Sequence, residues 1–146
     1  MNILVLNGPN MNLLGIRQPE IYGKATYEDL KAMVQTEADR LGVDISFFQS
    51  NHEGALVDAI QQAYFDGVDG IIINPAAYTH TSVALLDAVK AVGIPTVEVH
   101  VSDPDTREDF RHVSYIRAAC VATIRGHGLP GYVEALQLLH GMLTNP

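Results

Sequence analysis

Residues 70–74 read Gly-Ile-Ile-Ile-Asn, and this run indicates the fold class of the chain most clearly. Its apolar residues do not alternate with polar ones, which is typical of a strand buried on both faces of a parallel sheet. Similar β-rich runs lie on either side of it, at residues 3–6, 45–48, 96–101 and 121–124. The sequence therefore predicts an α/β protein built on a five-stranded parallel sheet.

Helical patterns separate the first four runs, at residues 27–41, 56–65 and 81–92, and another follows the last run at 132–143. In each, apolar residues recur with a spacing close to the 3.6-residue period of a helix. Strands that alternate with helices indicate an open sheet covered by helices on both faces, a three-layer sandwich. The chain shows no linker or internal repeat, so we expect residues 1–146 to form one catalytic domain.

Two helix starts carry capping signals. Thr26 with Asp29 resembles a capping box before the first helix, and Gly42 supplies a C-terminal stop. Ser50 and Glu53 have the same spacing before the second helix, which predicts a capping box there as well.

Composition and charge exclude several classes of protein. Of the 146 residues, 47% are hydrophobic, and 9 Lys and Arg stand against 17 Asp and Glu, which gives a net charge of −8. Nucleic acids and anionic membranes both require clustered cations, so neither is an expected partner.

Cys120 is the only cysteine, which excludes an internal disulfide and a multi-cysteine metal site. No apolar run is long enough for a signal peptide or a membrane helix, so we expect a cytoplasmic protein.

The connection from residue 7 to residue 25 is far longer than the two to six residues usual between a strand and a helix. Ligands bind beyond the carboxyl ends of strands in open α/β sheets, where this connection must lie. We therefore expect an active-site lid at about residues 15–25, with Gly8, Gly15 and Gly23 as hinges of the connection. The alternative is a packed Ω-loop without chemistry.

Polar residues gather at the predicted carboxyl edge of the sheet. Within the run at 96–101, Glu98, His100 and the following Ser102 alternate with valines, so their side chains share one face. A carboxylate two residues from a histidine can orient the ring and favour its protonated form. Each residue alone could belong to a strand that ends in a polar loop. Their convergence indicates a site, which would also contain Asn7, Asn10, Asn74, Tyr78 and His80.

Arginine and tyrosine side chains suggest what this site does. Arg17 in the long connection and Arg111 after the fourth run suit a small anionic molecule with a carboxylate. They could also ionise a nearby tyrosine, which at pH 7 needs about 4 kcal/mol of differential stabilisation. Tyr22 is the best-placed tyrosine for such a base, although an aromatic that anchors the loop by packing would look the same.

Other motifs point away from cofactor chemistry. Residues 126–131 match the Gly-x-Gly-x-x-Gly pattern, but no further strand follows, so we interpret them as a tight turn for close packing. A metal site would rest on His80, His100 and one carboxylate. Only three lysines are present and none is placed for imine chemistry, while Cys120 at the start of the last run is interpreted as a core thiol. Acid–base chemistry without a cofactor remains.

Five motifs together resemble a known family. They are Asn7-Gly8-Pro9-Asn10, Arg17-x-Pro19-x-x-Tyr22-Gly23, Asn74-Pro75-x-Ala77-Tyr78-Thr79-His80, Glu98-Val99-His100-x-Ser102 and Arg107-Glu108-x-Phe110-Arg111. The chain resembles the type II 3-dehydroquinate dehydratases over essentially its whole length. The resemblance implies a flavodoxin-like fold and the dehydration of 3-dehydroquinate to 3-dehydroshikimate, a step of the shikimate pathway and, in some organisms, of quinate catabolism.

The resemblance also implies a catalytic role for five residues. Tyr22 would be the base that takes the proton α to the ketone, and Arg17 would hold it ionised. Asn10 would stabilise the enolate through a water. His100, oriented by Glu98, would protonate the leaving hydroxyl group. No cofactor is implied.

Further residues would bind the substrate. The resemblance assigns the substrate hydroxyls to Asn74, His80 and Arg111, and the carboxylate to Val101 and Ser102. It also implies that Asp87 reaches in from a neighbouring subunit of a homododecamer, a tetramer of trimers. Without the resemblance, Asp87 is a solvated helix charge.

The chain departs from the family at residues 103–105, where Asp-Pro-Asp replaces what is usually an asparagine and an apolar residue. Two added carboxylates near the substrate-carboxylate loop would affect KM more than kcat. Two other interpretations remain, a flavodoxin-like module that binds a flavin or nucleotide and an inactive paralogue. The first would carry a Ser/Thr-rich phosphate loop after residue 6, and the second would have lost Tyr22 or Arg17.

Overall fold

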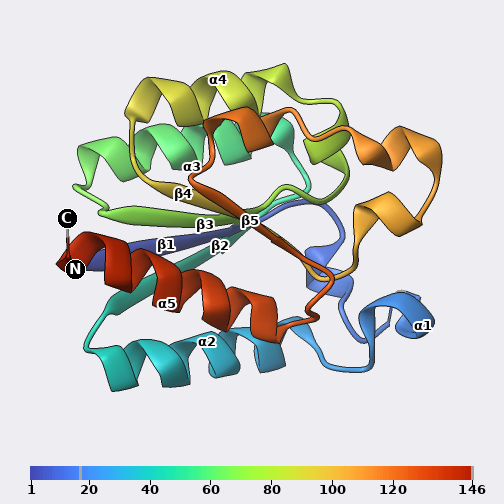
Figure 1. Cartoon of the computed structure of the whole chain (residues 1–146), viewed down its shortest axis with the longest axis horizontal. Coiled ribbons are helices and arrows are strands. Elements are labelled where there is room, and N and C mark those ends of the chain that lie inside the picture. The colour runs from blue at the N-terminus through green and yellow to red at the C-terminus, as the bar shows by residue number, and fades with distance from the viewer. Residues whose placement is uncertain (17, 146) are drawn as a thin grey trace.

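The computed structural model describes residues 1–16 and 18–145, except for the side chains of Ile21 and Tyr22. Its centre is a parallel sheet in the order β2-β1-β3-β4-β5 (Figure 1). The strands are β1 (Asn2–Asn7), β2 (Asp44–Gln49), β3 (Gly70–Asn74), β4 (Thr96–His100) and β5 (Ala122–Arg125). This strand order is flavodoxin-like, which confirms the predicted fold class.

Four long helices cover the sheet in two layers. Figure 1 shows α3 and α4 on one face, and α2 and α5 on the other. Their bounds are α2 Tyr27–Leu41, α3 Glu53–Phe65, α4 Val83–Val92 and α5 Pro130–Thr144. The three-layer sandwich is therefore confirmed. No helix within the described residues is long and apolar enough to cross a membrane.

Short helical turns lie mainly at the carboxyl edge of the sheet. They are η1 Met11–Leu13, α1 Pro19–Tyr22, η2 Ala76–His80, η3 Pro104–Thr106, η4 Asp109–His112 and η5 Ile116–Ala119. The first two belong to the long connection after β1, and the last three fill the connection between β4 and β5.

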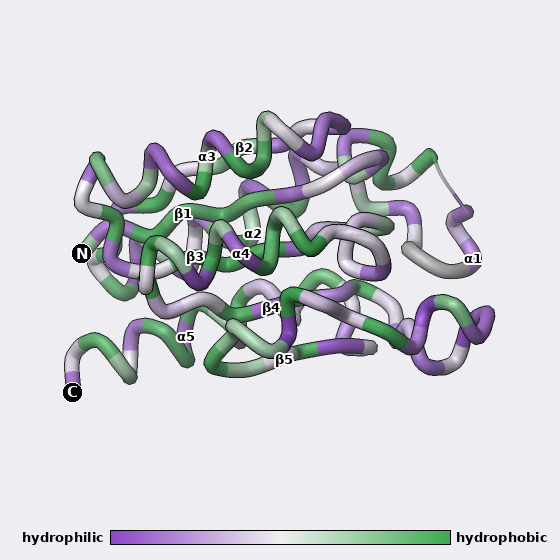
Figure 2. Tube along the Cα trace, turned by 90° about the horizontal axis from the view of Figure 1, so that it is seen from above, coloured by the Kyte–Doolittle hydropathy of each residue, from purple (hydrophilic) through white to green (hydrophobic). Residues whose placement is uncertain are grey.

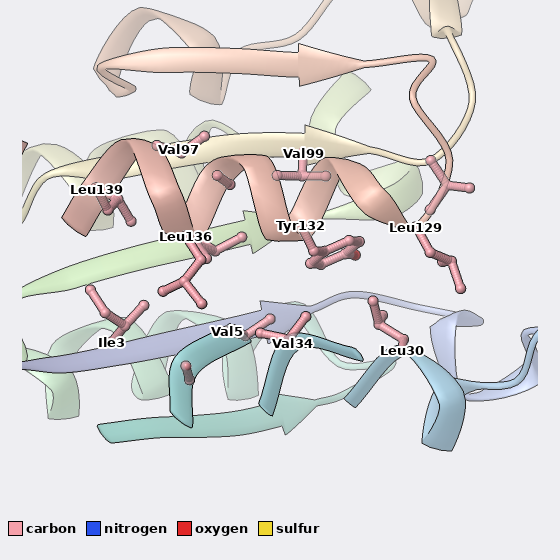
Figure 3. Close-up of a cluster of buried hydrophobic side chains, with 14 of the residues drawn as sticks. Ile3, Val5, Leu30, Val34, Val97, Val99, Leu129, Tyr132, Leu136 and Leu139 are labelled. Carbon is pink, nitrogen blue, oxygen red and sulfur yellow. The ribbon is translucent and has the colours of Figure 1, made fainter. Parts of the chain in front are cut away.

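The core on one face of the sheet lies between β1 and the helices α2 and α5. Figure 3 shows Leu136 and Tyr132 of α5 directed toward Ile3 and Val5 of β1, with Val34 of α2 close by. All five are essentially without solvent contact. The side chain of Tyr132 is large and reaches the carboxyl edge, so it joins this core to the polar residues there.

The second core lies under α3 and α4. Successive strand residues point to opposite faces, so Leu4 and Leu6 enter this core while Ile3 and Val5 enter the other. In β3 the residues Ile71 and Ile73 face α3 and α4, whereas Ile72 faces the opposite side. This explains why the isoleucines at 71–73 do not alternate with polar residues. Hydrophobic and hydrophilic residues alternate along α3 in Figure 2, as expected for a helix that packs one face on this core.

Two strands are less buried than the sequence predicts. Side chains along β2 alternate between exposed and half-buried positions, and those of β5 are half-buried throughout. Both strands lie at an edge of the sheet, where helices cover them incompletely. The prediction of strands buried on both faces is therefore wrong for β2 and for β5.

The two capping predictions have different outcomes. Thr26 and Asp29 form the predicted capping box, with each side chain accepting from the other residue's backbone N–H. The predicted box at Ser50 and Glu53 is wrong, because α3 begins at Glu53 with His52 as the N-cap. The Ser50 hydroxyl instead accepts from the backbone N–H of His52, at 3.0 Å.

Residues 126–131 form the expected close-packed turn. Gly126 and Gly128 adopt φ angles of 79° and 66°, which favour glycine. A Cβ atom on Gly131 would lie 3.3 Å from Cγ2 of Ile124, so α5 packs tightly on β5 here.

The cysteine precedes the last strand instead of beginning it, because β5 starts at Ala122. Cys120 is half-buried, packs against the α3–α4 core and donates to the carbonyl of Ile116 at 3.3 Å. Burial raises the pKa of its thiol to about 12, which fits a structural thiol.

Candidate active site

The topology brings the ends of β1 and β3 together at the carboxyl edge. The two strands are neighbours, and their last residues Asn7 and Asn74 pair in register. The chain leaves β1 toward α2 on one face and leaves β3 toward α4 on the other, so this point is the topological switch of the sheet. Open α/β sheets bind their ligands at such a point.

A cleft of about 70 Å³ opens at this edge. The last residues of β3 and β4 line it, together with residues that follow β1, β3 and β4: Pro9, Asn10, Met11, Asn74, Ala76, Ala77, His80, His100, Val101, Ser102, Pro104, Arg107 and Arg111. Seven predicted site residues are among them: Asn10, Asn74, His80, His100, Val101, Ser102 and Arg111. Residues distant in sequence therefore converge as expected.

The backbone around the cleft is constrained by a close approach of two loops. The N–H of Gly8 donates to the carbonyl of Asn74 at 2.8 Å. A Cβ atom on Gly8 would lie 2.3 Å from the carbonyl oxygen of Pro75, so only glycine fits. Ala76 follows with φ 54°, an unfavourable region for alanine. Its N–H donates to Oδ1 of Asn74 at 3.0 Å, which holds this strained turn in place.

A buried network fixes Asn74 from behind. The Tyr132 hydroxyl donates to Oδ1 of Asn7 at 2.6 Å and accepts from Nδ2 of Asn74 at 3.0 Å. Burial raises the pKa of Tyr132 well above its usual range, against the lowering effect of the Asn74 hydrogen bond. Tyr132 therefore stays protonated and is a structural anchor.

Glu98 and His100 form a buried pair at the end of β4. The Oε2 atom of Glu98 lies 2.5 Å from Nε2 of His100. Glu98 has no solvent exposure, and His100 is 6% exposed where it lines the cleft. Both side chains leave the same face of β4, as the sequence predicts. The strand ends at His100, so Ser102 belongs to the loop that follows.

Hydrogen bonds from separate elements stabilise the Glu98 carboxylate. Oε2 accepts from the hydroxyls of Ser114 at 2.7 Å and Thr79 at 3.2 Å, and Oε1 accepts from Thr123 at 3.1 Å. Arg117 donates to both oxygens, through Nε at 3.0 Å and Nη2 at 3.3 Å. Burial alone would raise the pKa of Glu98, but the bonds from His100, Arg117 and Ser114 outweigh it and hold the pKa far below its usual range.

The ionised state of Glu98 determines which imidazole nitrogen is available. An ionised carboxylate only accepts hydrogen bonds, so Nε2 of His100 carries a hydrogen atom. Nδ1 is then the nitrogen that can exchange a proton with a bound molecule. This arrangement can supply a general acid to the cleft.

We expect Glu98 to make the folded protein sensitive to acid. A carboxylate with a depressed folded pKa contributes stability above its ordinary value of 4.5, and this contribution is lost as pH falls below that value. The Glu98→Gln variant should be about 3 kcal/mol less stable at pH 7 and should show a flatter dependence on pH. Urea unfolding between pH 3 and 7 measures both quantities.

Asp58→Asn is the matched control, because Asp58 is an exposed carboxylate on α3. Its stability should follow pH as the wild type does. Parallel curves for Glu98→Gln and wild type would contradict the expected contribution of Glu98.

His80 reaches the cleft from η2. Its Nδ1 lies 2.7 Å from the carbonyl oxygen of Val113, so Nδ1 carries the hydrogen of the neutral ring. Burial lowers the pKa of His80, against the raising effect of the Val113 carbonyl, and Arg111 adds to the lowering. A neutral His80 can accept a hydrogen bond through Nε2.

Two arginines give the cleft its positive charge. Nε of Arg111 lies 2.6 Å from the Glu108 carboxylate, and its guanidinium group lies 4.9 Å from the centre of the Phe110 ring. Arg107 also lines the cleft. It appeared in the Arg107–Arg111 motif, but sequence reasoning assigned it no role.

The unusual carboxylates at positions 103 and 105 are paired with Arg125 of β5. Nη1 of Arg125 lies 2.5 Å from Oδ2 of Asp105, and Nε lies 3.8 Å from Oδ1 of Asp103. Pro104 between them lines the cleft, whereas neither carboxylate does. The loop after β4 is therefore tied to β5 on the side away from the cleft lining.

Not all predicted site residues line this cleft. Glu98 lies behind His100 and does not itself line the cleft, and Asn7 and Tyr78, which the sequence also placed in the site, do not line it. Arg17 and the side chain of Tyr22 lie outside the described part of the chain. Asp87 is exposed on α4 and does not line the cleft of its own chain. Within the described residues, no three His, Cys, Asp or Glu side chains are grouped to hold a metal ion.

A flavodoxin-like sheet with a buried carboxylate–imidazole pair and two guanidinium groups at its carboxyl edge defines an α/β enzyme with a small-molecule site. Comparison with known protein families identifies which α/β enzymes this chain is related to. The family described as Dehydroquinase class II matches residues 1–140. The chain belongs to the class II dehydroquinase family.

Relatives and solved structures agree over nearly the full length. A 3-dehydroquinate dehydratase of Caldicellulosiruptor bescii is 54% identical over 141 residues, which is 97% of each chain. One from Clostridium acetobutylicum is 50% identical over 144 residues, 99% of each chain. The crystal structure of the type II dehydroquinase of Butyrivibrio crossotus matches with a TM-score of 0.94 at 49% identity, covering 95% of this chain and 97% of that one.

Proposed function

We propose that this enzyme dehydrates 3-dehydroquinate to 3-dehydroshikimate by anti elimination through an enolate. The observation that carries the proposal is the buried Glu98–His100 pair, which opens into a cleft that also contains Arg107 and Arg111. This combination offers a proton donor for a leaving hydroxyl group and guanidinium groups that attract an anionic substrate into the cleft. Membership of the dehydroquinase family supports the choice of substrate.

The reaction begins with removal of the proton α to the ketone. Tyr22, ionised with the help of Arg17, takes this proton, and the C–H electron pair forms the enolate. Asn10 stabilises the enolate oxygen through a water, consistent with its place in the cleft lining. The enolate then re-forms the ketone and expels the β-hydroxyl group. His100 gives that group its proton, so water leaves, and the enzyme's proton returns from Tyr22 to His100 through solvent.

The remaining cleft residues bind the substrate. His80, Asn74 and Arg111 hold its hydroxyl groups, and Val101 with Ser102 binds its carboxylate. The backbone at these two positions is anchored, because their carbonyls accept from the N–H groups of Gly128 and Gly126 at 3.0 and 3.2 Å. Ala77, which follows the strained turn at Ala76, lines the same cleft as Val101 and Ser102.

A lid and a neighbouring subunit complete the proposed site. We infer that a lid at about residues 15–25 closes over the cleft of a single catalytic domain. Gly15 and Gly23 have φ angles of 86° and 79°, and a Cβ atom on Gly15 would lie 2.8 Å from the Lys24 carbonyl oxygen, so the loop closes on itself. We infer a homododecamer, a tetramer of trimers, in which the exposed Asp87 of α4 reaches the site of a neighbour.

The test is an ultraviolet assay of the purified protein with 3-dehydroquinate, following the conjugated enone of the product. We expect turnover that persists after treatment with a metal chelator or with borohydride. Loss of turnover with chelator would show a metal-dependent reaction, and loss with borohydride would show an imine. A folded protein without turnover would be an inactive paralogue, and flavin absorbance would indicate a binding module.

A further inference from the structure

Arg117 is bonded to Glu98, the carboxylate of the Glu98–His100 pair, on the side away from the cleft. It lies on η5 and donates to both oxygens of Glu98, while His100 contacts Oε2 of the same carboxylate. The Arg117 side chain is one-third exposed and does not line the cleft. Its position therefore gives it contact with Glu98 and none with a ligand in the cleft.

We propose that Arg117 is a positioning residue that sets how tightly the Glu98–His100 pair holds the proton used in catalysis. The proposal rests on the function proposed above, in which His100 protonates the leaving group. Arg117 acts on the reaction through Glu98, and its role is electrostatic.

Charge counting within the cluster gives the physical reason. With Arg117 present, the three side chains carry a net charge of +1 when His100 is protonated and zero when it is neutral. Without Arg117, loss of the His100 proton would leave the Glu98 carboxylate as an uncompensated charge with no solvent exposure. The buried carboxylate would then resist release of the proton. Arg117 compensates the charge of Glu98 when His100 is neutral. It therefore lowers the cost of transferring the His100 proton to the leaving group.

The other groups that act on this pair do not replace Arg117. The titratable or charged side chains around the pair are His80 on η2, Arg107 and Arg111 in the cleft lining, Arg125 of β5 and Cys120 after η5. Arg125 is the register neighbour of His100 and is paired with Asp103 and Asp105. His80 donates toward the Val113 carbonyl, and Arg111 is paired with Glu108. The thiol of Cys120 has a raised pKa and is uncharged. Among the described cations besides His100, Arg117 is the one that is bonded to Glu98.

The test compares Arg117→Gln, which removes the charge, with Arg117→Lys, which keeps it. Diethyl pyrocarbonate modifies neutral imidazole, and peptide mass spectrometry measures the modification of His100 as a function of pH. In Arg117→Gln, the midpoint for His100 should move upward by about one pH unit. In Arg117→Lys it should stay within a few tenths of a unit of wild type.

Kinetics supply the second readout. At neutral pH, kcat of Arg117→Gln should fall by up to about tenfold, because the proton is held about one unit more tightly. KM should be unchanged, and Arg117→Lys should recover most of kcat. Arg40→Gln is the matched control, since Arg40 is an exposed arginine of α2 paired with Glu37.

An unshifted or lowered midpoint in Arg117→Gln would overturn the proposal, as would equal midpoint shifts in the Gln and Lys variants. The labelling measurement needs no turnover. If the protein did not act on 3-dehydroquinate, an upward shift in Arg117→Gln would still establish the electrostatic link, and only the proposed function would fail.

Discussion

The Tyr22→Phe variant should lose about 10²- to 10⁴-fold of turnover with 3-dehydroquinate, the range that a general base contributes. Phenylalanine keeps the ring and removes the hydroxyl group that takes the α proton. Ionising that hydroxyl at pH 7 needs about 4 kcal/mol of stabilisation, so only a tyrosine held beside cations can perform the step. Steady-state kinetics should show the loss in kcat, with the unfolding midpoint unchanged.

A partial reaction makes this test sharper. If Tyr22 removes the α proton, the variant should also lose the exchange of that proton with solvent deuterium, which nuclear magnetic resonance can follow. Tyr64→Phe is the matched control, because Tyr64 is 60% exposed on α3. Exchange at the wild-type rate in Tyr22→Phe would assign the base to another residue.

The His100→Asn variant should also lose about 10²- to 10⁴-fold in kcat, but at the other proton transfer. Asparagine can keep a hydrogen bond to Glu98 and cannot protonate a leaving hydroxyl group. Enolate formation does not require His100, so this variant should still exchange the α proton with deuterium while it eliminates water slowly. The two variants therefore have opposite exchange behaviour and similar losses of turnover.

His52→Asn is the control for this substitution, since His52 is exposed at the start of α3. It should retain full turnover. A His100→Asn enzyme with kcat close to that of wild type, or with loss of exchange equal to that of Tyr22→Phe, would contradict the assignment of His100 as the acid.

The fold could be predicted because its signals are local. The run Gly70–Asn74 and the capping box at Thr26 depend on neighbouring residues, and the structure confirms both. The second predicted cap failed because Ser50 bonds to the residue two positions on, a choice that sequence spacing does not reveal. The predicted burial of β2 was wrong because β2 lies at an edge of the sheet. Which strand lies at an edge depends on the order of all five strands, and a single run of sequence does not show that order.

In the site, too, contacts between residues close in sequence could be predicted, and contacts between separate elements could not. Glu98 and His100 are two residues apart on one strand, so their contact follows from the alternation of side chains. The partners that keep Glu98 ionised come from separate elements, and Arg117 and Ser114 are ordinary polar residues until the chain is folded. Arg117 in particular lies 19 residues from Glu98 and shows no motif of its own.

The bond between Tyr132 and Asn7 has a consequence for how the protein is made. The two residues are 125 positions apart, and Tyr132 lies on α5, the last helix of the described chain. During synthesis, β1 leaves the ribosome long before the side chain that fixes its carboxyl end exists. Until α5 arrives, Asn7 and Asn74 lack the Tyr132 hydroxyl that joins them. The nascent chain can therefore pair its early strands, but the cleft can take its final shape only after translation has passed the last helix.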